Sequence, residues 1–278
     1  MILYAYTYTV GFVGVRSPNH YIAQEILRVS GLPIAAPSAN RFGHVSPTCY
    51  EHVINDLGDE NITIIKDDII KSGGCKVGIE STVVKVSDDG KELRILRCGA
   101  ITSTDISTVL LSYDIKSSVI NDNDITTKKK KSKNEADVAP GQMIKHYAPD
   151  LPTYIITNDN NNNNDNNILT IMKNEYNNEQ DTQKPINISD SFIIDYGNRL
   201  GKYKNICKKY LDLSEKGIPS EACRLVFQAL RLAEDKEVAN QGVKIVLLPD
   251  LRKATETDEL VQALWERMHR AASGNFVS

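Results

Sequence analysis

V-G-V-R-S-P-N-H at residues 13–20 and P-I-A-A-P-S-A-N-R-F-G-H-V-S-P-T at residues 33–48 are two polar loops, bounded by glycine and proline, that each leave an apolar strand. In an open sheet such loops stand at the strand ends, where ligands bind. The second loop gathers four hydrogen-bonding side chains: Ser38, Asn40, Arg41 and Ser46. Pro37 and Gly43 restrict its backbone to a path on which these donors converge. The two loops therefore predict a site for an anion such as a phosphate.

An α/β pattern surrounds these loops. In chain order it comprises a helix over 21–29 capped by Asn19, a short buried strand over 32–36, a helix from a Thr48–Glu51 capping box to Leu57 that stops at Gly58, and strands over 62–65, 78–86 and 93–97. Asp88-Asp89-Gly90 joins the last two strands as a hairpin. Because the second helix begins where the second polar loop ends, its unpaired amides and its dipole favour an anion there.

Composition then separates two domains. Residues 114–138 are polar and charged and predict a mobile linker. The lysine run at 128–131 is interpreted as solvated linker, with a nuclear-import signal as the alternative. A stretch at 158–167 that is nearly all asparagine predicts a disordered loop inserted after a strand, and its role is open. The expected domains are 1–113 and 151–278, with 114–150 between them.

The second domain repeats strands and helices. Strands are predicted over 154–157, 191–195 and 243–248, and a last helix over 257–272. A helix capped by Ser220 presents an apolar face made of Leu225, Val226, Ala229, Leu230 and Ala233. Strands that alternate with helices predict a small, parallel, Rossmann-like sheet. The expected fold class is α/β: part of a twisted mixed sheet with helices, a linker, and a small Rossmann-like domain.

The composition bears on the expected partners and the cellular location of the protein. A net charge of −3 gives no protein-wide positive field, so strong direct binding to nucleic acid is not expected. The five cysteines are far apart and form no C-x-x-C, which favours a reducing, cytoplasmic location. The sequence has no apolar run of about 20 residues and no signal-peptide order in its first residues, so no membrane association is expected.

Several side chains at strand ends could contact a ligand. Arg16 follows an apolar stretch, and an arginine there can hold a carboxylate with two hydrogen bonds; the alternative is a surface arginine. Arg97 precedes Cys98-Gly99, where small residues beside a positive charge allow a phosphate to approach. Ser81 and Thr82, expected in a strand, would face opposite sides of the sheet, and Thr82 is interpreted as structural.

The segment around His146 and Tyr147 is flanked by prolines and predicts a stiff stretch laid against another surface. Its alternative is a linker that docks on its own domain. No zinc-protease, cysteine-cluster, P-loop or G-x-S-x-G motif occurs, and neither a metal site nor a catalytic nucleophile is predicted. The residues offer positioning and charge, which is what an adenylate-forming reaction needs.

These residues, in this order, resemble the threonylcarbamoyl-AMP synthase family, the YrdC-like proteins, in the long form with an extra C-terminal domain. Beyond the two loops, the matching stretches are V-G-I-E-S-T-V-V at 77–84, L-R-I-L-R-C-G-A-I-T at 93–102, A-P-G-Q-M-I-K-H-Y-A-P at 139–149 and A-L-W-E-R-M-H-R-A-A at 263–272. The resemblance is close over about residues 10–150 and looser afterwards. It implies that residues 1–113 are the C-terminal portion of a YrdC-like domain.

The resemblance implies an enzyme that makes threonylcarbamoyl-adenylate and pyrophosphate from L-threonine, bicarbonate and ATP, with Mg²⁺ accompanying the ATP. A partner tRNA threonylcarbamoyl transferase then modifies adenosine 37 of tRNA. Carried over by motif, Ser38, Asn40, Ser46 and Arg97 would hold ATP or the adenylate, and His146 and Tyr147 would close over it. Arg16, Ala36 and Ser81 would line the threonine side, with Arg16 on the carboxylate.

The chain also departs from the family pattern. The P-T-E-T-x-Y-G-L and K-x-R motifs that open family members are absent, and Phe12 stands where a threonine is usual. Gln142 and Ile144 stand where lysine- and arginine-rich neighbours are expected. We interpret the sequence as N-terminally truncated and expect residues 1–278, expressed alone, not to make threonylcarbamoyl-adenylate.

Two other functions compete with this interpretation. One is a catalytically incomplete module that binds a nucleotide or double-stranded RNA, which a basic surface stripe would favour and the net charge of −3 disfavours. The other is the related domain of hydrogenase-maturation carbamoyltransferases, which carry zinc-finger cysteines that have no counterpart in the spacing of this chain.

Overall fold

The computed structural model describes residues 2–4, 13–66, 75–121, 146–157, 168–172, 185–255 and 258–278. The chain forms two compact units, and each is described by itself. The first unit holds the described residues up to Phe42 and between Ser46 and Lys76. The second holds Gly43–Val45 and the described residues from Val77 onward. The lysine run at 128–131 and the asparagine stretch at 158–167 lie outside the described residues.

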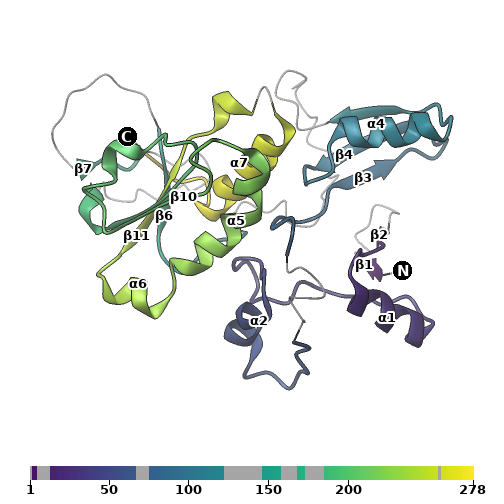
Figure 1. The fold of residues 1–278 in the computed structure, drawn as a ribbon, viewed down its shortest axis with the longest axis horizontal. Coiled ribbons are helices and arrows are strands. Elements are labelled where there is room, and N and C mark those ends of the chain that lie inside the picture. Colours follow the sequence, from purple (N-terminus) through teal and green to yellow (C-terminus); the bar gives the residue numbers. More distant parts are fainter. Residues whose placement is uncertain are drawn as a thin grey trace. The chain divides into compact units, whose positions relative to one another are not determined.

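In its described residues the first unit has one strand pair and two helices (Figure 1). Strands β1 (Ile2–Tyr4) and β2 (Gly14–Arg16) are antiparallel, with Ile2 opposite Arg16. Helix α1 (Tyr21–Ser30) ends at Gly31, whose φ of 62° is left-handed and whose amide donates to the Leu27 carbonyl. Helix α2 (Tyr50–Leu57) stops at Gly58. Both helices were predicted from the sequence.

Both predicted helix caps are wrong. The N-cap of α1 is His20 rather than Asn19, and no side chain caps this helix end. In α2 the N-cap is Cys49, again without a side-chain hydrogen bond. Thr48 lies one residue too early, because its amide donates to His52 Nδ1 (3.1 Å) instead of joining a capping box with Glu51. The N-cap side chain of α2 therefore makes no capping hydrogen bond.

Two predicted strands of this unit do not form. Residues 32–36 contain a single bridge residue at Ile34, and residues 62–65 are irregular. Their apolar side chains are not buried, since Leu32 is 68% exposed and Ile62 and Ile65 are about half exposed. A short apolar run becomes a strand only when a partner strand and a covering layer are available, and the described part of this unit supplies neither at these positions.

A small mixed sheet opens the second unit. Strand β3 (Val83–Val86) pairs antiparallel with β4 (Glu92–Arg97), and β5 (Ser118–Asn121) pairs parallel with β4. The predicted hairpin is confirmed: Gly90 has a φ of 69° and its amide donates to the Ser87 carbonyl. Helix α4 (Ser103–Ser112) crosses from β4 to β5 and starts with a capping box of Thr102 and Asp105.

Two boundaries in this region were predicted wrongly. The strand expected from residue 78 begins at Val83, because residues 78–82 form a loop. The linker expected from residue 114 contains β5, so 118–121 belong to the sheet. The polar residues of β5 concealed it, since this strand carries no alternating apolar pattern long enough to identify it.

The larger part of the second unit is a five-stranded, fully parallel sheet, as predicted (Figure 1). Its strand order is β10-β9-β11-β6-β12. The strands are β6 (Thr153–Ile156), β9 (Ser191–Asp195), β10 (Lys209–Asp212), β11 (Ile245–Pro249) and β12 (Phe276–Val277). Short elements follow β6 and flank β9: β7 (Ile168–Leu169), β8 (Ile186–Asn187), η2 (Ile188–Asp190) and η3 (Gly201–Tyr203).

Alternate residues of this sheet face two different apolar cores. Phe192 and Ile194 of β9 belong to a core with helices α5 (Pro219–Leu232) and α7 (Glu259–Ala271), whereas Ile193 belongs to a smaller core on the other face. Burial on both faces explains why these strands read as continuous apolar runs. Helix α6 (Lys236–Asn240) and η4 (Arg252–Ala254) complete this domain.

The helices of this domain confirm the predicted apolar faces but not the predicted cap. Helix α5 begins with Pro219 in its first turn, so Ser220 lies inside the helix and does not cap it. Helix α7 is capped by Asp258, whose carboxylate accepts hydrogen bonds from the amides of Leu260 and Val261. No helix in the described part of the chain is both long and apolar enough to span a bilayer.

Candidate functional site

The predicted site residues fall into two sets. Ser38, Ala36, Asn40, Ser46 and Arg16 belong to the first unit, and Ser81, Arg97, His146 and Tyr147 belong to the second. The structure brings the members of each set into one unit, and we describe the two sets separately.

In the first unit the polar loop is anchored by an arginine that was predicted as a ligand donor. The Arg41 amide donates to the Asp56 carboxylate (3.2 Å), and its guanidinium lies 3.7 Å from the same group. The Asp56 side chain is 2% exposed, so Arg41 ties the loop to helix α2. Ser38 is exposed and Asn40 half-buried, with the Asn40 amide donating to the Arg41 carbonyl (2.8 Å).

Arg16 ends strand β2, as predicted, and is exposed. Ala36 is half-buried, and Ser46 precedes the uncapped start of α2. Uncapped amides and the positive end of a helix dipole favour a negative ligand. The geometry of this loop is therefore compatible with the predicted anion site.

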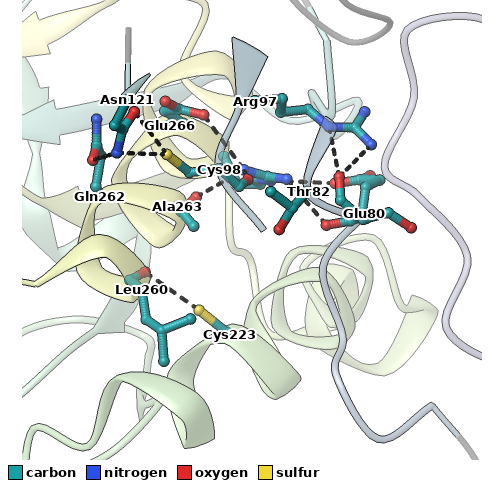
Figure 2. Close-up of polar contacts among 12 residues, drawn as sticks. Glu80, Thr82, Arg97, Cys98, Asn121, Cys223, Leu260, Gln262, Ala263 and Glu266 are labelled. Carbon is teal, nitrogen blue, oxygen red and sulfur yellow. Dashed lines mark hydrogen bonds and ion pairs between the residues drawn. The ribbon is translucent and has the colours of Figure 1, made fainter. Parts of the chain in front are cut away.

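In the second unit Arg97 fixes the neighbouring loop. Its guanidinium donates two hydrogen bonds to the Ser81 carbonyl, from Nε (3.1 Å) and Nη2 (2.8 Å), as Figure 2 shows for the Arg97 fork. Thr82 Oγ1 donates to the Ile101 carbonyl (2.7 Å) and accepts from the Ile101 amide (3.2 Å), which confirms that Thr82 is structural. Ser81 itself is exposed. The loop thus holds Ser81 in place through its backbone and leaves its hydroxyl at the surface.

Two glycines let this loop approach its neighbours closely. Gly78 has a φ of +80°, and a Cβ added there would lie 2.4 Å from backbone atoms of Cys223 and Arg224 in α5. A Cβ on Gly99 would lie 2.3 Å from the Thr82 amide nitrogen. Both distances exclude a side chain, so the loop 78–82 is packed against backbone on both sides.

Arg267 of α7 reaches the same loop from the C-terminal domain. This buried guanidinium, 1% exposed, lies 3.2 Å from Glu80 Oε2 through Nε and donates to the Cys98 carbonyl through Nη1 (2.6 Å). Burial alone would lower the pKa of Arg267, but Glu80, Tyr147 and Glu266 outweigh it and hold the pKa above its ordinary value. A charged side chain is therefore buried between the loop and the helix.

The charges around this point do not cancel. Arg97, Arg267 and Arg270 stand against Glu80 and Glu266, which leaves one positive charge among these five residues. Burial lowers the pKa of Arg97 and of Arg270, although both guanidinium groups remain cationic at neutral pH. Burial raises the pKa of Glu266, partly offset by the three arginines. A cationic, partly desolvated surface of this kind favours an anionic ligand.

His146 and Tyr147 lie on the C-terminal domain. The Tyr147 ring is 1% exposed and packs 5.1 Å from Phe227 of α5, and its φ of 62° is left-handed. The backbone around it is held by a hydrogen bond from the Ala148 amide to the Gly43 carbonyl (3.1 Å). For Tyr147 the structure therefore favours the alternative in which this segment docks on its own domain.

Unlike the packed ring of Tyr147, the His146 ring has a nitrogen that could contact a ligand. Within the described residues its buried Nδ1 atom has no hydrogen-bond partner, and the ring makes an edge contact with Tyr147 at 4.1 Å. Burial lowers the pKa of His146, so the imidazole is neutral at pH 7. A neutral imidazole with an open ring nitrogen can donate to or accept from a ligand.

The burial of Tyr147 predicts that the folding stability of the chain falls at alkaline pH. Burial, with Glu80, raises its pKa to about 12 from 10, so its stabilising contribution is complete below pH 10 and is lost as the pH rises from 10 to 12. At pH 11 this loss is about 1.4 kcal/mol. Urea unfolding at pH 9 and pH 11 should show Tyr147→Phe losing about that much less stability than the wild-type chain. An equal loss in both proteins would contradict the prediction.

Within the second unit, the segment Gly43–Val45 contacts α5 and the residues that follow this helix. His44 Nε2 lies 2.9 Å from both Glu234 carboxylate oxygens, and the Asp150 amide donates to Glu234. Arg231 of α5 donates to the Val45 carbonyl. These contacts account for the inclusion of Gly43–Val45 in the second unit. His44, Asp150 and Glu234 also form the one group of metal-type ligands among the described residues, with ligand atoms within 4.8 Å.

Family models match both parts of the chain. A model named Sua5_yciO_yrdC, described as telomere recombination, matches residues 4–99. A model described as the C-terminal domain of threonylcarbamoyl-AMP synthase matches residues 101–273. The chain belongs to the threonylcarbamoyl-AMP synthase family. The two family models meet at about residue 100, before α4, whereas the sequence analysis placed the end of the first domain at residue 113.

Curated members of the threonylcarbamoyl-AMP synthase family are similar over half of the chain. The protein of Bacillus subtilis is 39% identical over 143 residues, which are 51% of this chain and 36% of the relative. That of Schizosaccharomyces pombe is 35% identical over 147 residues (52% and 32%), and that of Pyrococcus abyssi 33% over 144 residues (52% and 37%). The matched part spans about a third of the length of these relatives.

Solved structures of the threonylcarbamoyl-AMP synthase family support the fold. Pyrococcus abyssi Sua5 complexed with L-threonine superposes with a TM-score of 0.59 at 23% identity, covering 94% of this chain and 64% of that one. The same protein with a histidine and the following tyrosine replaced by alanine gives 0.55 at 20% identity, covering 94% and 63%. The mixed and parallel α/β architecture of the chain is thus that of family members.

Sequence reasoning missed the charged residues that α7 and α5 contribute. Arg267 lies on the buried face of α7 among Ala263, Leu264, Met268 and Ala271. A charged residue at an apolar position of an amphipathic helix was the available signal, since such a residue must have partners when buried. Nothing in the local sequence indicates that those partners are Glu80 and Cys98, which lie more than 160 residues away.

Proposed function

We propose that this chain acts in threonylcarbamoyl-adenylate synthesis, using L-threonine, bicarbonate and ATP and releasing pyrophosphate. The observation that carries the proposal is the convergence of three separate sequence stretches in one unit. The loop 78–82, the end of β4 and the His146–Tyr147 segment meet around Arg97, Glu80 and Arg267. The reaction proposed for this surface is the one that gives the threonylcarbamoyl-AMP synthase family its name.

The proposed reaction needs no protein nucleophile. The threonine amine adds to the carbon of bicarbonate and water leaves, giving a carbamate. A carbamate oxygen then attacks the α-phosphorus of ATP, and the bond to the departing pyrophosphate breaks. Each step is accelerated by positioning the reactants and by stabilising the negative charge of the phosphates, which the arginines supply.

The substrates are assigned to the predicted residues. In the first unit, Arg16 would bind the threonine carboxylate, Ala36 would line the threonine side, and Ser38, Asn40 and Ser46 would bind the nucleotide. In the second unit, Ser81 is assigned to L-threonine and Arg97 to the nucleotide. His146 offers its open Nδ1 to the nucleotide, whereas the burial of Tyr147 limits that ring to packing. A magnesium ion accompanying ATP would be held mainly by the phosphates and water, because Ser38, Asn40 and Ser46 offer neutral oxygens and no carboxylate.

We further propose a downstream partner and a cellular location. The product would pass to a tRNA threonylcarbamoyl transferase that modifies adenosine 37, and the reaction would take place in the cytoplasm. The alternative of a module that binds double-stranded RNA is not proposed, because the net charge of −3 provides no overall attraction for a phosphate backbone.

Two substitutions should separate the two substrates. Arg16→Ala should weaken L-threonine binding by about 10-fold to 150-fold, since a hydrogen-bonded charge pair contributes about 1.5–3 kcal/mol, and should leave binding of a non-hydrolysable ATP analogue unchanged. Ser38→Ala should weaken the ATP analogue by about fivefold and leave L-threonine unchanged. Isothermal titration calorimetry of the 278-residue chain measures both.

Arg28→Ala is the matched control for Arg16, because Arg28 is an exposed arginine of the same unit that pairs with Glu25. It should bind both ligands like the wild-type chain. Loss of ATP-analogue binding with intact threonine binding in Arg16→Ala would show that the substrate sides are assigned the wrong way round.

A further inference from the structure

Arg267 connects two strand ends of the site to the C-terminal helix α7. Its Nε atom bonds to the Glu80 carboxylate and its Nη1 atom to the Cys98 carbonyl, and Nη2 lies 3.5 Å from the Glu80 carbonyl. One planar guanidinium thus holds the loop 78–82 and the end of β4 at once. Lysine could not do this, because an ammonium group on a flexible stem lacks the fixed fork of donors.

Arg97 and Arg267 hold adjacent residues of that loop. Arg97 bonds to the Ser81 carbonyl, and Arg267 bonds to Glu80, one residue earlier. On the opposite side, Gly78 presses against the backbone of α5. The loop is therefore held at 78 by α5, at 80 by α7 and at 81 by β4. Two of these three supports come from the C-terminal domain.

The support leaves one side chain of the loop directed away from these contacts. Ile79 is 8% exposed, the Glu80 side chain is engaged by Arg267, and Thr82 bonds to the backbone of residue 101. Ser81 is exposed. A loop fixed through its neighbours presents such a hydroxyl in one orientation, which is what specific recognition of a small substrate requires.

We propose that Arg267 is a positioning residue: through Glu80 and Cys98 it sets the conformation in which Ser81 meets L-threonine, so the C-terminal domain is a structural part of the substrate site. The choice of threonine as the ligand rests on the proposed function. Arg267 itself is buried and touches no substrate.

The positioning role is tested first without any substrate. In Arg267→Lys, which keeps the charge and removes the fork, hydrogen–deuterium exchange of peptides covering 78–83 and 97–101 should be at least tenfold faster, while exchange in β9 and β11 stays unchanged. Tyr210→Phe is the control, because it removes a partly buried hydrogen bond to Asp195 (2.6 Å) elsewhere in the same domain. It should leave exchange at 78–83 as in the wild-type chain.

Calorimetry then connects the loop to the substrate. Arg267→Lys should raise the dissociation constant for L-threonine at least tenfold, and Tyr210→Phe should not change it. Unchanged exchange in Arg267→Lys, or faster exchange with unchanged threonine affinity, would overturn the proposal. Absence of threonine binding to the wild-type chain would refute the proposed function instead, because the exchange result does not depend on a ligand.

Discussion

Replacing Gly78 with alanine is expected to lower the free energy of unfolding by about 3–5 kcal/mol, among the largest single-residue effects in this chain. Two costs add at this position. The φ of +80° is strained for a residue with a Cβ, and that Cβ would lie 2.4 Å from the α5 backbone, which cannot move aside as a side-chain end can. Urea unfolding followed by circular dichroism measures the change.

Gly90→Ala separates the two costs. Gly90 also has a left-handed φ, of +69°, but a Cβ there meets nothing within 4 Å. It should therefore cost about 1 kcal/mol, the conformational cost alone. Equal losses in the two variants would show that the loop 78–82 is not packed against α5.

Replacing Arg267 with methionine is expected to cost about 3–5 kcal/mol, because it leaves the carboxylates of Glu80 and Glu266 without their buried cation. The free energy of unfolding from urea titration is again the measurement. Arg252→Met is the control: Arg252 pairs with Asp250 but is half exposed, and exposed pairs contribute less than about 1 kcal/mol.

A double variant tests the cause of that loss. Adding Glu80→Gln to Arg267→Met removes one of the two carboxylates that lost their directly paired cation and should recover part of the stability. A double variant less stable than Arg267→Met alone would mean that the helix loses packing rather than charge balance.

The parallel sheet was predictable because the apolar pattern of its residues along the sequence indicates which of them are buried. Strand β9 is buried at every residue and was predicted with the same ends, and α5 shows its apolar face at helical spacing. Strand β5 was missed because its assignment depends on pairing with β4, which no local pattern expresses. Caps at Asn19, Thr48 and Ser220 were wrong because several polar residues compete at each helix start and the chain path decides among them.

The sequence predicted which residues could bind a ligand at the candidate site. It did not predict the hydrogen bonds that hold these residues in place. Arg97 lies at a strand end as expected, but its guanidinium bonds to the Ser81 carbonyl, a contact that depends on the turn at Gly78. Arg41 was predicted as a ligand donor and instead anchors the loop to Asp56. Such roles are fixed by tertiary contacts between residues far apart in sequence, which spacing alone does not contain.

We propose that this chain binds L-threonine through residues that its own fold holds in place. Calorimetric titration of L-threonine into the wild-type 278-residue chain, with bicarbonate and an ATP analogue present, tests it most directly. We expect saturable binding that Arg16→Ala and Arg267→Lys each weaken at least tenfold, while Arg28→Ala and Tyr210→Phe leave the affinity unchanged. The absence of saturable binding by the wild-type chain, or equal affinity in all five proteins, would contradict it.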